Sequence, residues 1–220
     1  MDIAEIWPPY RLRITAGDLE LAIISDDDVP EFVDLVLDGV HDPEFMPFGV
    51  QWTDAPREEL PANFVRFHWA VRAALTPDDW TLPFAVRRNG ELVGTQDLKG
   101  KQFMITRSCS TGSWLGRRFH GRHIGTRMRQ AVCAFAFDEL GATEMTTGAF
   151  ADNAPSLGVS RNVGYQPNGR ERVVRRGVAA DHRSLRLTPE TFNRGDDQLC
   201  VTGAEVVPQF LGIESAHHAA

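Results

Sequence analysis

The alternation of hydrophobic and polar positions predicts a mixture of strands and helices along this chain. Residues 19–24 alternate and end in β-branched side chains, which predicts a strand. Ser25 and the three aspartates after it predict a helix start, because such residues cap a helix and suit its first turn. This helix is expected to end near Gly39, and a second is predicted over residues 61–75. Between them, residues 41–56 predict a loop rich in proline and aromatic residues.

The middle of the chain carries a strong hairpin signal. Residues 82–88 and 91–98 flank Asn89-Gly90, a pair typical of a tight turn between two antiparallel strands. Residues 103–115 predict the next strand, with an interruption near Ser108 left open. Apolar residues recur at helical spacing over residues 122–140, which predicts a helix there. This helix is expected to stop at Gly141.

The last elements predicted are shorter. Residues 144–150 predict a strand, and Asp152 or Asn153 is expected to cap a helix that ends near residue 162. Gly164-Tyr165 leads into a strand, and residues 172–176 and 184–187 predict a final antiparallel pair. The pattern after Phe192 is weak, and residues 214–220 predict a frayed tail.

This order of elements predicts a mixed sheet with helices on its faces, not a regular βαβ alternation. Neither repeats nor a clear linker interrupt the sequence. We therefore expect a single α/β domain over residues 1–192, followed by a C-terminal extension over residues 193–220 whose tail is partly disordered.

Composition narrows the function. The net charge of −7 over 220 residues argues against a general nucleic-acid binder and suits a substrate that carries an amine. Three scattered cysteines are too few for a disulfide framework or a zinc site, so no metal is expected. The N-terminus lacks the features of a signal peptide, and the longest apolar run falls far short of the ~20 residues of a membrane span. The cytoplasm is the expected compartment.

Residues 112–126 form the most informative segment, in which a strand ends, a turn rich in glycine and arginine follows, and a helix begins. The first N–H groups of a helix have no intrahelical partner, and the helix dipole favours negative charge there. The turn alone fits either an anion site or a tight connection with solvated arginines. A P-loop is excluded because its sequence signature is missing, and no regular βαβ unit supports a Rossmann site.

Several of these residues together resemble the GNAT superfamily of N-acyltransferases, in the branch of the ribosomal-protein acetyltransferases RimJ and RimL. The resemblance covers about residues 12–187 and includes the order of elements, the Trp114-Leu115-Gly116 strand end, and Asp152-Asn153 with Ser156 ahead of Gly164-Tyr165. The loop segments 39–43, 46–48 and 52–53, together with residues 79–83 and 112–116, further resemble an actinobacterial subgroup that includes a mycobacterial succinyltransferase-like protein. The resemblance implies a GNAT fold, with a mostly antiparallel mixed sheet, a splayed strand pair and helices on both faces.

The resemblance also implies a binding site for acyl-coenzyme A. Two positions depart from the family pattern in the turn, because His120 replaces Gln or Arg and His123 replaces the first glycine. The Cβ of His123 then narrows the approach to the pyrophosphate, or its imidazole contacts a phosphate. The residues expected to bind the cofactor are Trp114, Leu115, Gly116, Arg117, Arg118, His120, Gly121, Arg122, His123, Ile124, Gly125, Thr126, Asn153 and Ser156.

Catalytic roles follow from the same resemblance. Ser156 is expected to protonate the leaving thiolate and Asn153 to contact the pantetheine or the acceptor, although both residues also fit a plain helix cap. A backbone N–H near Leu115 would polarise the thioester carbonyl. The branch often carries a glutamate where this chain has Ser110, so the general base is open. The candidate bases are Asp97 at the end of a central strand, His41 beside Asp42, and less favourably His68.

Other roles of these residues remain open. His41 also fits a histidine that anchors the loop, and Asp97 also fits a solvated acid at a strand edge. Four large apolar residues of the loop, Phe45, Met46, Phe48 and Trp52, are expected either to wall the acceptor or acyl pocket or to pack in the core. Tyr165 matches a family position near the thiol but fits core packing equally well.

The sequence thus predicts an N-acyltransferase that moves an acetyl or succinyl group from coenzyme A to a primary amine, which is a protein N-terminus, a lysine or a small amine. Transfer is expected to be direct, in a ternary complex, because no cysteine is placed for a covalent intermediate. Two alternatives are a non-catalytic acyl-CoA-binding module and an acetyltransferase of aminoglycoside antibiotics. We expect no interaction with nucleic acid or with a membrane. We expect the protein to form a homodimer or a higher homo-oligomer.

Overall fold

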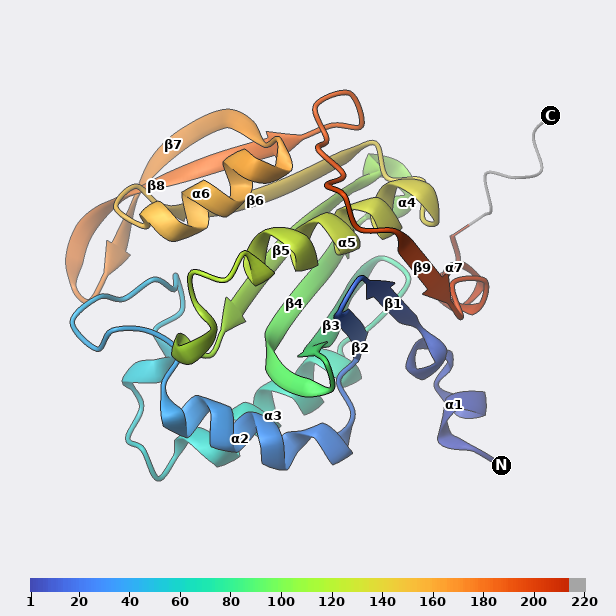
Figure 1. Cartoon of the computed structure of the whole chain (residues 1–220), viewed down its shortest axis with the longest axis horizontal. Coiled ribbons are helices and arrows are strands. Elements are labelled where there is room, and N and C mark those ends of the chain that lie inside the picture. The colour runs from blue at the N-terminus through green and yellow to red at the C-terminus, as the bar shows by residue number, and fades with distance from the viewer. Residues whose placement is uncertain (214–220) are drawn as a thin grey trace.

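A single nine-stranded sheet forms the centre of the molecule (Figure 1). The computed structural model describes residues 1–213, so the predicted tail at residues 214–220 lies outside the described residues. The spatial order of the strands is β7-β8-β6-β5-β4-β3-β2-β1-β9. Their bounds are β1 Arg13–Ala16, β2 Leu19–Ile23, β3 Asp79–Arg88, β4 Glu91–Lys101, β5 Ser108–Leu115, β6 Glu144–Phe150, β7 Gln166–Arg175, β8 Val178–Leu187 and β9 Leu199–Thr202.

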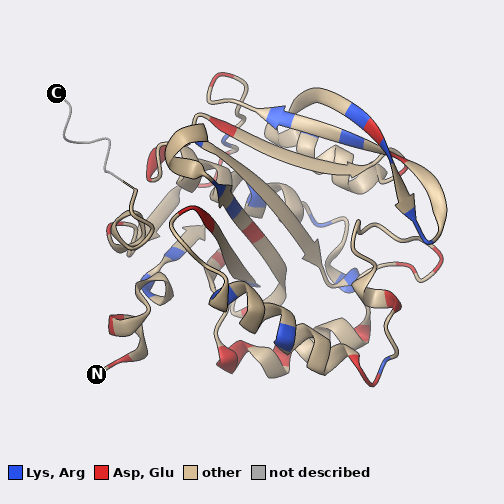
Figure 2. Ribbon diagram, turned by 180° about the vertical axis from the view of Figure 1, so that it is seen from behind, with Lys and Arg blue, Asp and Glu red and all other residues tan. Residues whose placement is uncertain are grey.

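Helices cover both faces of this sheet. The α-helices are α1 Ile3–Ile6, α2 Val29–Asp38, α3 Leu60–Ala73, α4 Phe103–Thr106, α5 Ile124–Asp138, α6 Ala154–Val163 and α7 Val206–Phe210. Short 3-10 turns occupy Pro8–Arg11, Asp26–Asp28, Trp52–Asp54 and Arg117–Phe119. Helices α5 and α6 lie on one face, and α2 and α3 lie on the other, where they cover only part of the sheet (Figures 1 and 2). Within residues 1–213, no helix is long and apolar enough to cross a membrane.

The strands β5 and β6 diverge, and this divergence opens the sheet. They pair in parallel only where Ser108–Ser110 meet Glu144–Thr146, whereas the other neighbouring strands pair antiparallel. Beyond Ser110, the polar backbone groups at this edge of β5 face β6 without a ladder partner. A splayed pair therefore lies at the centre of the sheet.

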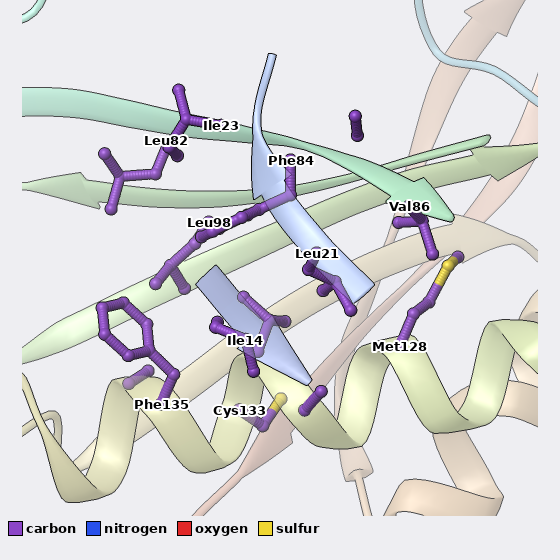
Figure 3. Close-up of a cluster of buried hydrophobic side chains, with 14 of the residues drawn as sticks. Ile14, Leu21, Ile23, Leu82, Phe84, Val86, Leu98, Met128, Cys133 and Phe135 are labelled. Atoms are coloured by element: carbon purple, nitrogen blue, oxygen red, sulfur yellow. The ribbon is translucent and has the colours of Figure 1, made fainter. Parts of the chain in front are cut away.

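Helix α5 is the central element of the core. Every residue from Met128 to Phe137 is buried, which is typical of a helix enclosed on all sides. Its apolar side chains pack against those of the sheet, among them Phe84 and Leu98 (Figure 3). The other side of α5 contacts α6 and the segment after β8, where the tilted ring of Phe192 packs on Phe137 at 5.4 Å between ring centroids.

Most of the predicted elements are confirmed, and the local signals explain why. Asn89 and Gly90 both adopt positive φ, as a two-residue hairpin turn requires. Ser25 and Asp28 form a capping box ahead of α2, and Gly39 ends that helix. The structure also has the mixed sheet, the splayed pair and the helices on both faces.

The prediction of a strand over residues 103–107 is wrong. Residues 103–106 form the helical turn α4, which lies between two left-handed residues, Gln102 and Arg107. The Phe103 ring is fully buried against Trp80, so tertiary packing overrides the strand propensity of this segment. The strand itself begins at Ser108.

Five elements were either not predicted or predicted too short. Strand β1 and helix α7 are short, and β9 pairs with β1 although its sequence pattern is weak. Strands β7 and β8 extend over residues 166–175 and 178–187, beyond the predicted pair. Most of their residues are exposed, so hydrophobic alternation gives little signal there.

Candidate active site

A cavity of about 720 Å³ opens at the splay between β5 and β6. Its walls come from the C-terminal half of β5, the turn before α5, the middle of β6 and the start of α6. The loop after α2 closes one side through residues that include His41, Phe45 and Phe48. The unpaired strand edges and a helix N-terminus therefore face the same space.

The turn before α5 presents free backbone donors to this cavity. The first backbone bond within the helix runs from the Arg127 N–H to the His123 carbonyl at 3.2 Å, so the N–H groups of Ile124, Gly125 and Thr126 have no intrahelical partner. His123 precedes them in the left-handed region, at φ 60° and ψ 4°. A helix N-terminus of this kind favours an anion such as a phosphate.

Only some of the predicted turn residues contact the cavity. Arg117 and Arg122 line it, together with His120, Gly121, His123, Ile124, Gly125 and Thr126. Arg118 turns away and pairs with Asp38 at 2.8 Å and with Glu91 at 3.4 Å. A Cβ on Gly116 would lie 2.3 Å from Leu35 Cδ1, so this glycine lets the strand end approach α2. The geometry thus gives Arg118 and Gly116 structural contacts outside the cavity lining.

His120 and Gly125 shape the turn. The Nε2–H of His120 donates to the Leu115 carbonyl at 3.0 Å, a carbonyl that the splay leaves without a strand partner. A Cβ on Gly125 would lie 3.2 Å from Val159 Cγ2, so the missing side chain keeps α5 close to α6. Both residues hold the turn in place at the mouth of the cavity.

Asn153 and Ser156 begin α6 at the opposite wall. The Asn153 side chain caps the helix by accepting the Ser156 N–H at 3.1 Å, and both residues line the cavity. Asp152 is not the cap, because its carboxylate forms a two-point pair with Arg175 at 2.8 and 2.6 Å. That guanidinium lowers the pKa of Asp152.

The end of β5 presents a backbone donor to the splay. The Gly116 N–H bonds to the Val93 carbonyl of β4 at 2.9 Å. Because successive N–H groups of a strand point to opposite edges, the Leu115 N–H faces the splay. Trp114 and Leu115 both line the cavity, as expected.

Asp97 lies beside this cavity but does not line it. It is the cross-strand partner of Gly112, which does line the cavity, and a Cβ on Gly112 would lie 3.6 Å from Asp97 Oδ2. Burial raises the pKa of this carboxyl, and Lys99, whose Nζ lies 3.3 Å from Oδ2, partly offsets that effect. Asp97 is thus a shielded acid next to the splay and not a solvated strand-edge residue.

The two histidine candidates sit in different surroundings. His41 lines the cavity, yet both of its ring nitrogens bond within its own loop. Its Nδ1 lies 2.8 Å from the Asp42 carbonyl and its Nε2 lies 2.7 Å from Thr53 Oγ1. The Asp42 backbone, not its carboxylate, therefore orients the ring. His68 is buried away from this cavity, and burial lowers its pKa to about 4.

The aromatic residues of the loop fall into two groups. Phe45 and Phe48 line the cavity, and Trp52 links Phe48 to Trp114 at centroid distances of 5.4 and 5.8 Å. Met46 is buried behind them. Tyr165 packs in the core, with its hydroxyl 3.5 Å from Cys133 Sγ.

Sequence reasoning missed Arg129 in α5. Arg129 is 4% exposed, lines the cavity, and donates to side chains of β4, β5 and β6. The sequence did carry a signal, because Arg129 is the only charged residue in the run from Met128 to Phe137. Within residues 1–213, no group of three or more metal-ligating side chains is found.

Comparison with known proteins gives a family match and a shared fold. The acetyltransferase (GNAT) domain family matches residues 18–166, more than half of the chain. Mycobacterium smegmatis RimJ in complex with CoA-disulfide has 19% sequence identity over 92% of this chain and 96% of that chain, with a TM-score of 0.70.

Two further solved structures share the fold. An acetyltransferase from Salmonella typhimurium that modifies the N-terminal serine of the ribosomal protein L7/L12 is 17% identical over 78% of this chain and 95% of that chain, with a TM-score of 0.62. A chimera of the Vibrio cholerae spermidine N-acetyltransferase SpeG and hSSAT is 13% identical over 78% and 96%, with a TM-score of 0.62. The family match covers more than half of the chain, so this chain belongs to the GNAT acetyltransferase family and is an N-acyltransferase.

Proposed function

We propose that this enzyme binds acyl-coenzyme A in the splay cavity and transfers an acetyl or succinyl group directly to a primary amine. The acceptor is a protein N-terminus, a lysine or a small amine. The observation that carries the proposal is the shared cavity, in which free N–H groups of a helix N-terminus and an unpaired strand edge face one space. The first feature suits a pyrophosphate and the second suits a thioester.

The phosphate end of the cofactor is assigned to the turn. The N–H groups of Ile124, Gly125 and Thr126 donate to the pyrophosphate, and Arg117 and Arg122 add positive charge at the same wall. The pantetheine then extends between α5 and α6 toward Asn153. This placement leaves Arg118 in its ion pairs with Asp38 and Glu91.

The reacting end is assigned to the splay. The neutral amine nitrogen attacks the thioester carbonyl carbon, and the Leu115 N–H stabilises the oxyanion that forms. Asp97, which lies beside the cavity, accepts through a water molecule the proton that the attacking nitrogen loses. The C–S bond then breaks, the thiolate takes the proton of the Ser156 hydroxyl, and water returns to Ser156 the proton that Asp97 accepted.

Asp97 is preferred over His41 as the base because of their surroundings. Burial raises the pKa of Asp97 and so makes it a stronger base than an exposed aspartate. Both nitrogens of His41 are held by its own loop, which favours a role in anchoring that loop.

The proposal extends to the cell compartment and the oligomeric state of the enzyme. We propose that the enzyme acts in the cytoplasm as a homodimer. Free cysteines support a reducing compartment, with Cys109 and Cys133 buried and Cys200 exposed. Light scattering on the purified protein tests the dimer, and a monomer at micromolar concentration would contradict it.

Release of free thiol is the experiment that tests the proposed activity. Acetyl-CoA and succinyl-CoA are each mixed with the enzyme and a panel of amines that includes peptide N-termini, polyamines and aminoglycosides. We expect thiol release that depends on one class of amine, with the matching amide found by mass spectrometry. Tight CoA binding without thiol release on the whole panel would instead support a non-catalytic binding module.

A further inference from the structure

Arg129 is a buried cation in the wall of the splay cavity. Its guanidinium donates to Gln96 Oε1 at 3.3 Å, to Thr147 Oγ1 at 3.2 Å and to Ser113 Oγ at 2.8 Å. These bonds link α5 to β4, β5 and β6, so Arg129 spans the floor of the splay. Only 4% of the residue is exposed, and Arg129 is one of the residues that line the cavity.

The charge of Arg129 is not neutralised by any acid in residues 1–213. All three acceptors are neutral oxygens, and no Asp or Glu of the described chain lies within ion-pair distance. The other arginine near the middle of α5, Arg127, pairs with both Asp18 and Asp197. Because an unpaired charge inside a protein is costly, such a group calls for an anionic partner.

The surrounding bonds hold this guanidinium in one position. Gln96 is fully buried and fixed by two further bonds, from its Nε2 to the carbonyls of Asp97 and Gly112. Thr147 in turn donates to the Thr111 carbonyl at 3.2 Å. A guanidinium has five N–H donors, and three hydrogen bonds leave two of them for a ligand.

The position of Arg129 also separates it from the phosphate end of the site. It lies six residues after His123 along α5, which corresponds to about 9 Å along the helix axis. It faces Ser113 and Thr147, the residues on the two diverging strands. The anion that it meets is therefore at the acyl end of the bound thioester and not at the pyrophosphate.

We propose that the preferred acyl donor carries a free carboxylate, as in a dicarboxylic acyl thioester of CoA, and that Arg129 binds this carboxylate. The inference rests on the proposed acyl-CoA function of the cavity. Two parallel N–H bonds from a guanidinium to a carboxylate match in geometry, and Arg is suited to this contact more than Lys is. Arg129 is thus the residue that distinguishes such donors from neutral ones.

The wild-type enzyme provides the first test, by calorimetric titration with CoA, succinyl-CoA and butyryl-CoA. Succinyl and butyryl chains have the same number of carbons and differ in the terminal carboxylate. We expect succinyl-CoA to bind at least about tenfold more tightly than butyryl-CoA. Equal affinity, or tighter binding of butyryl-CoA, would overturn the inference while leaving the CoA site intact. Failure of CoA itself to bind would overturn the proposed function and the inference with it.

Three variants provide the second test. Arg129→Gln should lower kcat/KM for succinyl-CoA by about 30- to 1000-fold, as expected for loss of one partner of a buried charge pair. It should change the value for butyryl-CoA by less than about fivefold, and Arg129→Lys should restore part of the preference. The control is Arg194→Gln, the same change at an arginine whose side chain is 55% exposed, which should change neither value.

The comparison between donors separates the possible roles of Arg129. An equal loss of rate with both donors in Arg129→Gln would show that the guanidinium acts on the leaving thiolate or braces the strands, and it would overturn the proposal. If this variant does not fold, the wild-type preference between succinyl-CoA and butyryl-CoA still decides the question.

Discussion

At the scale of single residues, His123 shows how one substitution changes a phosphate-binding turn. It occupies the position where the family pattern has its first glycine, and its backbone is left-handed. A residue with a Cβ is strained in that region by about 1 kcal/mol, whereas glycine adopts it freely. The sequence shows that His123 replaces a glycine of the family pattern. The structure adds that the backbone at this position is left-handed, which favours glycine.

Replacing His123 with glycine tests the role of its imidazole. We expect His123→Gly to keep the affinity for CoA or to tighten it by a few-fold, because the turn keeps its shape and the approach to the N–H groups widens. The free energy of unfolding should rise by up to about 1 kcal/mol. Calorimetric titration with CoA measures the first effect. A loss of affinity beyond tenfold would mean that the imidazole is itself a phosphate ligand.

Asp97 is shielded from solvent beside the splay, and this setting affects both its basicity and the stability of the fold. As a largely shielded acid with a raised pKa, it binds its proton more tightly in the folded state than in the unfolded state. Its contribution to stability is therefore greatest below pH 3.8 and is lost as the pH rises through its folded pKa. The ionised form of Asp97, which acts as the base at neutral pH, therefore lowers the free energy of unfolding.

The variant Asp97→Asn should separate activity from stability. We expect kcat to fall by about 100-fold or more, because the proton acceptor is gone. The free energy of unfolding at pH 7 should be unchanged or higher, and the affinity for CoA should stay the same. Asp138→Asn, at an exposed acid that pairs with Arg194, is the matched control. Full activity in Asp97→Asn would mean that the base lies elsewhere.

At the scale of elements, helices and turns with local signals were predicted, and the elements fixed by distant contacts were not. The Asn89-Gly90 hairpin and the capped start of α2 depend on residues within a few positions of each other. The turn α4 depends on Trp80, and β9 depends on β1, so neither leaves a local pattern. The splay followed from the family resemblance and not from the pattern of the residues.

His68 in helix α3 should make the stability of the fold depend on pH in the acidic range. This histidine stacks among the rings of Phe32, Phe64 and Phe67, and burial lowers its pKa from 6.5 to about 4. A depressed histidine pKa means that the unfolded chain takes up a proton that the folded chain does not. Stability from this group is therefore present above pH 6.5 and is lost as the pH falls toward 4.

Substituting His68 with leucine should flatten this dependence. Between pH 6.5 and pH 4 the wild-type protein should lose up to about 3 kcal/mol of unfolding free energy through His68, since each pH unit corresponds to about 1.4 kcal/mol. The variant His68→Leu should show a shallower fall over the same interval in urea titrations. An identical slope in both proteins would argue that other groups cause the loss.

At the scale of the whole molecule, the segment after residue 192 completes the sheet. Strand β9 pairs with β1, and Arg127 of α5 pairs with Asp197 ahead of that strand. Helix α7 and the residues after it bury Val207, Leu211 and Ile213. We therefore propose that this extension is part of the folded domain, although its sequence pattern is weak.

Removing this segment should destabilise the entire fold. Each of its three buried apolar side chains contributes about 1.5–3 kcal/mol, and together they approach the total stability of a typical domain. We expect a chain that ends at Gly195 to melt far below the wild-type protein or not to fold. Leu211→Ala should cost about 2–5 kcal/mol by the same reasoning. The control is Val174→Ala at an exposed position of β7, whose free energy of unfolding should stay within about 0.5 kcal/mol of the wild-type value. Equal melting temperatures for the truncated chain, Leu211→Ala and the wild-type protein would contradict this account.

The central claim is that acyl-CoA binds along α5 and places its thioester in the splay. A crystal structure of the enzyme with CoA is the measurement that tests it most directly. We predict pyrophosphate oxygens within hydrogen-bond distance of the N–H groups of Ile124, Gly125 and Thr126, and a sulfur atom between Leu115 and Ser156. Coenzyme A bound outside this cavity, or bound with its phosphates away from the α5 N-terminus, would contradict the account.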